Sequence, residues 1–153
     1  MKAVVQRVSE ARVTVDGEVR GQIGRGYMVL LGVERGDTEA HGDYIADKLT
    51  KLRIFEDSEE KMNLDIKQVS GDMLVISQFT LITDIPVGNR PYFGGAEAPD
   101  KAEALYEYTC ASLEKLLGKP VQRGVFGAHM EVALVNDGPV TIVINSRDKI
   151  KSV

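Results

Sequence analysis

The sequence predicts an α+β fold in which antiparallel and mixed β-sheets form a barrel-like core and two main helices pack outside it. Several short runs alternate apolar and polar residues with the period of two that strands show. Residues 27–33 are apolar on both faces, as expected of a central strand covered on both sides. Two segments, starting near Thr38 and Pro99, carry apolar residues at helical spacing. We expect the 153 residues to form a single domain.

The first strands are expected to form an antiparallel meander. β-prone residues occupy three runs at the start of the chain: residues 3–8, 11–15 and 18–23. Asp16-Gly17 separates the last two runs and is a common hairpin dipeptide, because glycine accepts a positive φ. A later apolar run, residues 73–76, should be another buried strand. It ends in Ser77-Gln78-Phe79-Thr80-Leu81, where polar side chains interrupt a buried run and are either satisfied locally or facing a ligand.

The first helix is predicted from about Thr38 to Leu52, because Ile45 and Leu49 recur before Leu52 at helical spacing. His41 lies near the start of this helix, where we expect it to be exposed.

The second helix is predicted to begin at Pro99-Asp100, with Asp100 and Glu103 spaced as in a capping box. Gly118 and Pro120 should end it. The segment before it, residues 83–95, is rich in Pro, Gly and Asn and should be a long irregular loop. Such loops are often functional in a compact domain.

The hexapeptide Asn136-Asp137-Gly138-Pro139-Val140-Thr141 lies between two runs with a strand's period of two, residues 130–134 and 140–144. This pattern predicts a hairpin that turns at Asp137-Gly138. Pro139 is unusual there, because it removes a backbone donor where the return strand should begin to pair. A Gly-Pro bond can also adopt the cis form at a cost of about 0.5–1 kcal/mol, and glycine lets another molecule approach the backbone closely.

Composition argues against several classes of function. The formal net charge of −4 provides no basic field for non-specific binding to long nucleic acid, and the cations are scattered. No apolar run is long enough to span a bilayer, and no secretory signal precedes the first strand, so we expect a cytoplasmic protein without a membrane partner. The single cysteine, Cys110, should be buried as a small hydrophobe.

Groups for conventional catalysis are scarce in this chain. It contains only two histidines, His41 and His129, and no spacing typical of a zinc site, a catalytic triad or a phosphate-binding loop. We therefore expect neither a metal nor a cofactor.

Two stretches carry a resemblance to a known family. Ser77-Gln78-Phe79-Thr80-Leu81 and the hexapeptide at 136–141 together resemble the paired signature of the D-aminoacyl-tRNA deacylases. Further segments match in the family's order over nearly the full chain: Gln6-Arg7-Val8, Lys61-Met62-Asn63-Leu64, Gly88-Asn89-Arg90-Pro91 and Ala102-Glu103-Ala104-Leu105-Tyr106. The chain departs from the family's pattern at three places: His129 replaces an acidic residue, Tyr92 a frequent Ser, and Ile85-Pro86-Val87 a more polar loop.

The resemblance implies an enzyme that removes a D-amino acid from mischarged tRNA by hydrolysing the ester bond to the terminal ribose. The amides of Phe79 and Thr80, with the groups of Ser77 and Gln78, would form an oxyanion hole and hold the substrate's amino group and carbonyl. An aminoacyl ester is already activated, so this site can work without a triad. As the assisting group, the substrate's own ribose hydroxyl ranks above Thr80, since no base accompanies Thr80.

The resemblance also implies a homodimer with active sites at the subunit interface, and Gly138-Pro139 of one subunit would enter the pocket of the other. D- and L-residues differ by exchanging hydrogen and side chain at Cα, so a backbone wall against one direction excludes every L-residue. A cis bond would turn both carbonyls toward the ligand, with Arg7 hydrogen-bonded to the loop. Glycine has no side chain, so hydrolysis of glycyl-tRNA is a corollary.

Two alternatives stay open. One is a non-catalytic module that binds an aminoacyl-tRNA or RNA acceptor end through residues 83–95, and the other is a Thr80-dependent esterase acting on small molecules. Without the resemblance, Phe79 would be assigned to the core and Arg7 to the solvated surface.

Overall fold

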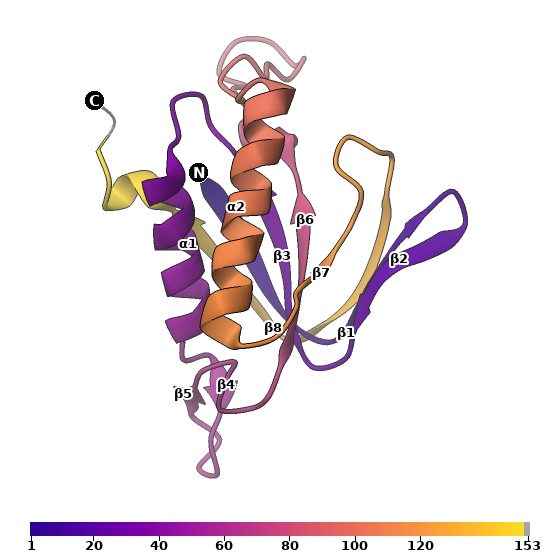
Figure 1. Ribbon diagram of the computed structural model, residues 1–153, viewed down its shortest axis with the longest axis vertical. Helices are drawn as coiled ribbons and strands as arrows, with labels where there is room; N and C mark the ends of the chain where they lie inside the picture. Colours follow the sequence, from indigo (N-terminus) through magenta and orange to yellow (C-terminus); the bar gives the residue numbers. More distant parts are fainter. Residues whose placement is uncertain (152–153) are drawn as a thin grey trace.

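The computed structural model describes residues 1–151, and its main feature is a mixed β-sheet that curls almost into a barrel (Figure 1). The strands follow the order β2-β1-β3-β6-β7, and β8 pairs with the other edge of β1. Their bounds are Lys2–Val15 for β1, Glu18–Ile23 for β2, Gly26–Gly32 for β3, Asp72–Ser77 for β6, Gln122–Arg123 for β7 and Glu131–Asn145 for β8. β3 and β6 are parallel, whereas β1 is antiparallel to β2, β3 and β8.

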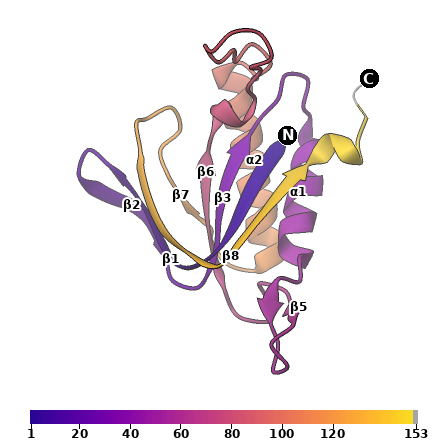
Figure 2. The same cartoon turned by 180° about the vertical axis from the view of Figure 1, so that it is seen from behind.

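Two helices, α1 (Glu39–Lys51) and α2 (Pro99–Leu117), lie side by side across one face of the sheet, as both views show (Figures 1 and 2). The predicted α+β class, with a mixed barrel-like core and two helices outside it, is therefore confirmed. The remaining elements are short: β4 (Phe55–Glu56) pairs with β5 (Met62–Leu64), and η1 (Phe79–Leu81) and η2 (Ser146–Asp148) are single 3₁₀ turns. Within residues 1–151, no helix combines the length and apolar character needed to cross a bilayer.

The long strand β1 connects the two halves of the sheet. The two β-prone runs predicted before Asp16 are one strand of 14 residues, which pairs with β3 through Lys2–Val8 and with β2 from Ala11 onward. Bulges near Val8 change which face the side chains point to. Ala3 and Val5 accordingly pack under the helices, whereas Val8 and Val13 fill the interior of the curl. The predicted central strand, β3, lies between β1 and β6.

The predicted hairpin at residues 136–141 is wrong. β8 is one continuous strand of 15 residues, and both of its halves pair antiparallel with β1. Gln6 pairs with Thr141 and Val8 with Asn136, so residues 137–140 bulge out opposite Arg7. Both flanks have a strand's period because both belong to the same edge strand. The turn residues produce a bulge instead of a reversal, and edge strands and bulges tolerate proline.

The first helix has the predicted bounds, but His41 is buried instead of exposed. Thr38 is the N-cap residue and Leu52 the C-cap residue. His41 Nδ1 lies 2.7 Å from Ser146 Oγ at the start of η2, and that hydroxyl also accepts from the α-ammonium of Met1 at 2.9 Å. The 3₁₀ turn η2 contacts the start of α1 through Ser146, and the local sequence around His41 does not reveal this contact.

The predicted capping box of the second helix is absent. The N-cap residue is Ala98, whose side chain makes no cap hydrogen bond. Pro99 occupies the first helical position, where its fixed φ favours a helix, so Asp100 already lies inside the first turn. The predicted end is confirmed, because Gly118 adopts the left-handed conformation at φ 74°. Cys110 is buried in this helix, and burial raises the pKa of its thiol to about 11.

Candidate active site

The first predicted stretch forms a tight polar turn at the end of β6. Ser77 is the last residue of this strand, and the Gln78 amide still donates to the carbonyl of Leu31 at 2.8 Å. The chain then leaves the sheet through η1. Gln78 Nε2 donates to Thr80 Oγ1 at 2.5 Å, so the two predicted side chains hold each other. Phe79 is 58% exposed and packs edge-on against Phe93 at 5.2 Å, so it is not a core residue.

The backbone of this turn offers two free donors. The amides of Leu81 and Ile82 close the turn by donating to the carbonyls of Gln78 and Phe79. The amides of Phe79 and Thr80, in contrast, donate to no acceptor within residues 1–151, as expected at the start of a short helix. Both residues are exposed. Two adjacent N–H groups that are unpaired and accessible are the arrangement that an oxyanion hole requires.

The second predicted stretch lies on Arg7, which is only 5% exposed. Arg7 Nε donates to the carbonyl of Asp137 at 3.0 Å, and Nη1 donates to the carbonyl of Ile54 at 2.6 Å. Two carboxylates stand slightly farther away, Glu56 at 3.8 Å and Asp137 at 3.7 Å. The guanidinium therefore ties the residue before Gly138 to the body of the protein, instead of being a solvated surface cation.

The bulge itself is shaped by Asn136. Its side-chain oxygen accepts from the Val140 amide at 3.0 Å, and its side-chain nitrogen donates to Thr141 Oγ1 at 3.0 Å. These two hydrogen bonds join the start of the bulge at Asn136 to its end at Val140 and Thr141. Gly138 has φ 138°, the Gly138–Pro139 peptide bond is cis, and both residues are exposed. The hexapeptide thus presents its backbone outward from a fixed base.

The two stretches lie apart in a single chain. Ser77 pairs with Leu31 of β3, whereas Arg7 pairs with Tyr27 of the same strand. Four residues of strand separate these positions, or about 13 Å at the rise of a parallel strand. Ser77, Gln78, Phe79 and Thr80 are thus together at one place, and Arg7, Gly138 and Pro139 are together at another.

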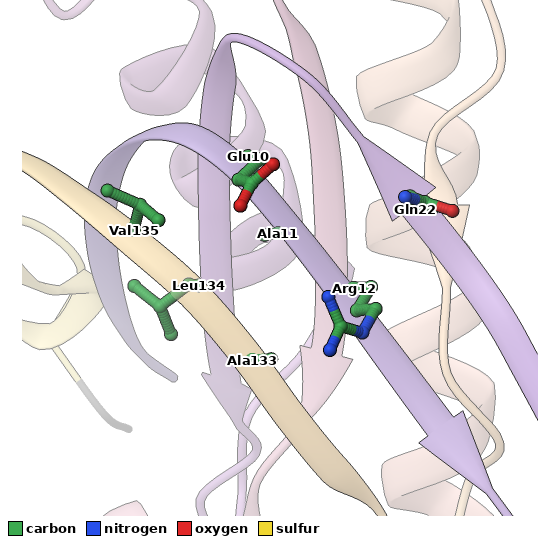
Figure 3. Close-up of a pocket in the computed structure, with 7 residues that line it drawn as sticks. All are labelled: Glu10, Ala11, Arg12, Gln22, Ala133, Leu134 and Val135. Atoms are coloured by element: carbon green, nitrogen blue, oxygen red, sulfur yellow. The ribbon is translucent and has the colours of Figure 1, made fainter. Parts of the chain in front are cut away.

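The two cavities described below likewise do not bring the two predicted stretches together. A cavity of about 120 Å³ beside the bulge is lined by Arg7 and Asp137, together with Arg25, Phe55 and Glu56. A second hollow of about 90 Å³ lies over three paired strands and is lined by residues such as Glu10 of β1, Gln22 of β2 and Leu134 of β8, which Figure 3 labels. The second hollow contains none of the predicted site residues. Neither cavity includes Ser77 to Thr80, of which Ser77 and Gln78 are half-buried and Phe79 and Thr80 are exposed.

Several contributors were not predicted. The carbonyls of Ile54 and Asp137 hold Arg7, but a backbone acceptor leaves no signal in a sequence. Phe93 supports Phe79 from the loop at 83–95, which was expected to be functional only in general terms. Asn136 belongs to the hexapeptide, and its side-chain role could have been suspected because Asn often bonds to nearby backbone in turns. Within residues 1–151, no three His, Cys, Asp or Glu side chains are grouped as metal ligands.

Comparison with known proteins identifies the family. The family model described as D-Tyr-tRNA(Tyr) deacylase matches residues 4–145. The chain belongs to this family. A D-aminoacyl-tRNA deacylase of Symbiobacterium thermophilum is 57% identical over 95% of this chain and 96% of its own length. Another, from Anaeromyxobacter dehalogenans, is 56% identical over 96% of this chain and 98% of its own.

Two solved structures share the fold of this chain. A protein titled c-Myc DNA Unwinding Element Binding Protein superimposes with a TM-score of 0.89 at 40% identity, covering 95% of this chain and 98% of its own. A probable eukaryotic D-amino acid tRNA deacylase superimposes with a TM-score of 0.78 at 20% identity, covering 94% of this chain and 97% of its own. The second likeness, at that identity, shows a shared fold.

Proposed function

We propose that this protein hydrolyses the ester bond of D-aminoacyl-tRNA and releases the free D-amino acid and tRNA. The observation that carries the proposal is the pair of unpaired amides at Phe79 and Thr80, in a chain that belongs to the deacylase family along nearly its whole length. The reaction is a chiral proofreading step. We assign it to the cytoplasm and to a single domain spanning the chain, as the sequence suggests.

The chemistry follows from the geometry of the turn. The ester carbonyl lies with its oxygen toward the Phe79 and Thr80 amides, which stabilise the negative charge that develops as water adds to the carbon. Ser77 and Gln78 hold the amino group and the carbonyl. The bond between the carbonyl carbon and the ribose oxygen then breaks, and that oxygen leaves with the proton that the attacking water gives up. The neighbouring ribose hydroxyl orients the water, so the protein needs to supply no base.

Selection of the D-isomer is assigned to Gly138 and Pro139. Both are exposed on a bulge that Arg7 and Asn136 hold in place. A wall of backbone tests only the position of the substituent at Cα, so it rejects L-residues regardless of their side chain. Glycine passes the same test, and glycyl-tRNA is therefore a further substrate.

A homodimer completes this site. One chain holds the two stretches about 13 Å apart along β3, so the wall must come from a second subunit. The sheet offers a surface for this contact: Val143, Val4 and Leu30 are paired neighbours across three strands, and Val143 is 69% exposed. Val4 and Leu30 are half-buried, so this apolar row on the sheet face stays partly open to solvent, which is common at subunit interfaces.

The proposal is tested by comparing the hydrolysis of a D-aminoacyl-tRNA with that of its L-isomer. Purified protein is incubated with D-tyrosyl-tRNA and with L-tyrosyl-tRNA, each with and without a chelator, and release of the amino acid is followed. We expect rapid hydrolysis of the D-substrate alone, unaffected by the chelator. Equal rates on the two isomers, or a requirement for zinc, would eliminate the proposed mechanism.

A binding module without catalysis is the second candidate, because the structural neighbour at 40% identity is titled a DNA unwinding element binding protein. The net charge of −4 argues against tight binding of duplex DNA through the phosphate backbone. Recovery of bound D-aminoacyl-tRNA with its ester intact after prolonged incubation would select this candidate.

A further inference from the structure

The segment between η1 and α2 exposes an unusual amount of apolar surface. Nine large apolar side chains are exposed among the described residues, and four of them lie between positions 79 and 92. These are Phe79 at 58%, Ile85 at 63%, Val87 at 89% and Tyr92 at 65% exposed. Such a concentration marks an interaction surface, whereas single exposed apolar residues need no explanation.

Tyr92 is held in place on this surface. The backbones of Asp84 and Tyr92 exchange two hydrogen bonds of 2.8 and 3.0 Å. The Tyr92 ring lies across Gly94, where a Cβ would collide with it. One part of the ring is thereby supported, while most of it stays open to solvent. A supported aromatic ring loses little entropy when a flat ligand stacks on it.

The loop is attached to the proposed reactive turn at both of its ends. Near its start, Thr83 Oγ1 donates to the carbonyl of Thr80. Near its end, Phe93 packs against Phe79 at 5.2 Å. Asp84 follows Thr80 by four residues, so it lies at most about 14 Å away along the chain. Tyr92, paired with Asp84, is therefore within reach of nucleotides that adjoin a ribose bound at the turn.

Charge favours the approach of an anion to this loop. Arg90 is exposed and forms no hydrogen bond or ion pair with any residue of 1–151. Asp84 is the only carboxylate in residues 83–95. The helices α1 and α2 expose charges of both signs, with Glu39, Asp43, Asp100, Glu103 and Glu107 beside Lys48, Lys51, Lys101 and Lys115. Arg90 is therefore a cation that is available to a phosphate at this loop.

We propose that Tyr92 and Arg90 bind the unpaired nucleotides that precede the terminal nucleoside of the tRNA. Tyr92 stacks on a base, and Arg90 pairs with a phosphate. Stacking suits an enzyme that accepts many tRNAs, because every base has a flat face. This inference rests on the proposed function and extends it, since it assigns the tRNA end to residues outside the reactive turn.

The kinetic test compares two substrates, D-tyrosyl-tRNA and D-tyrosyl-adenosine, which lacks the preceding nucleotides. We expect Tyr92→Ala to raise KM for the tRNA by about tenfold with kcat nearly unchanged, and to leave D-tyrosyl-adenosine unaffected. Tyr92→Phe should behave as wild type. Arg90→Ala should reduce the salt dependence of KM. Tyr108→Ala on α2 and Arg20→Ala on β2 are the matched controls and should change neither substrate.

Binding tests the inference separately from hydrolysis. Wild type should prefer a labelled RNA hairpin with an unpaired 3′ end over the same hairpin without it, and Tyr92→Ala should lose this preference. If wild type cleaves neither substrate but shows the preference, the proposed function fails and the inference stands. The inference is overturned if Tyr92→Ala has the wild-type KM for the tRNA, or if it raises KM equally for D-tyrosyl-tRNA and D-tyrosyl-adenosine. It is also overturned if Tyr92→Ala changes the oligomeric state of the protein in solution.

Discussion

At the scale of single residues, the reactive groups of the proposed mechanism belong mainly to the backbone. The amides of Phe79 and Thr80 are free, and Gly138 presents its backbone to solvent. Side chains serve to position them, as Arg7 does for the carbonyl of Asp137. Such a site explains why the chain lacks the usual combinations of nucleophile, base and metal ligand.

Thr80→Ala separates the proposed mechanism from a conventional esterase. The Thr80 hydroxyl accepts from Gln78 and, within residues 1–151, donates to no carboxylate or imidazole. It is therefore not activated as a nucleophile. We expect the variant to keep its rate on D-tyrosyl-tRNA within about tenfold of wild type, in a single-turnover assay. A nucleophile would cost on the order of 10⁴-fold or more, and a loss of that size would assign the chemistry to Thr80.

Gly138→Ala should damage both the bulge and the selection of the D-isomer. A Cβ at this position would lie 2.7 Å from Val140 Cγ2 and 3.2 Å from Arg7 Nη2, at a φ of 138° that L-residues rarely adopt. We expect a loss of about 1–3 kcal/mol in unfolding free energy and a lower ratio of D- to L-tyrosyl-tRNA hydrolysis. Gly127→Ala, with φ 77° and open space around it, is the matched control. Unchanged stereoselectivity in Gly138→Ala would remove this residue from the wall.

The sequence singled out both stretches as candidates but gave no information on their surroundings. Residue type alone would place Arg7 on the surface, because charged side chains are rarely buried, and only the family resemblance predicts its hydrogen bond to the loop. Its two carbonyl partners lie 47 and 130 residues away and have no sequence signal. The same rule alone would place Phe79 in the core, whereas the family resemblance places its amide in the site; the side chain is exposed, and the amide donates to no acceptor within residues 1–151.

At the scale of secondary-structure elements, the local sequence pattern predicted the type of each element well but predicted poorly which strands pair with each other. The period of two around the hexapeptide correctly indicated strands on both sides. It could not show that both sides pair with the same strand, since pairing depends on β1, more than 100 positions earlier. A bulge and a hairpin use the same residues, and only the partner strand distinguishes them.

The junction between α1 and η2 should make stability depend on pH through His41. Burial lowers the pKa of His41, and the ammonium of Met1 and Arg147 act in the same direction, whereas Asp37 and Glu34 oppose the shift. The unfolded chain therefore takes up a proton near pH 6.5 that the folded protein resists. The contribution of His41 to the free energy of unfolding is therefore complete above about pH 6.5 and is lost as the pH falls below it. We expect wild type to lose about 1 kcal/mol of unfolding free energy between pH 7.5 and 5.5 from this group.

Two variants isolate the effect in urea titrations at both pH values. His41→Gln removes the titrating group and should flatten the dependence. Ser146→Ala removes the hydroxyl that faces Nδ1 but keeps the buried imidazole, so its dependence should persist. An exposed histidine would give identical slopes in wild type and His41→Gln, and that result would contradict the buried position.

At the scale of the whole molecule, the fold class followed from composition and periodicity, but the assembly of the site did not. The strands hold Ser77 and Arg7 at different positions along β3 in every copy of the chain. No local pattern states whether the proposed site is completed within one chain or between two copies. The apolar row of exposed Val143 and half-buried Val4 and Leu30 is visible only once the register is known, because the three residues come from three strands.

Val143→Lys should therefore break the dimer and the activity together. A charge in the middle of the apolar row has to be desolvated on association, and a buried unpaired charge costs several kcal/mol. We expect a monomer by analytical ultracentrifugation and loss of D-tyrosyl-tRNA hydrolysis. Val135→Lys, on the same strand but outside the row, should leave both unchanged. A monomeric Val143→Lys protein with full activity would place the whole site in one chain.

Complementation between two inactive variants tests the shared site directly. Gln78→Ala damages the reactive turn and Gly138→Phe blocks the wall, so each homodimer should be inactive. In a mixed dimer, one site combines both defects, while the other receives an intact turn from one subunit and an intact wall from its partner. Random mixing makes about half of the dimers mixed, each with one working site, so about a quarter of wild-type activity should return. If both parts belonged to one chain, every site would keep one defect, and mixing would restore nothing.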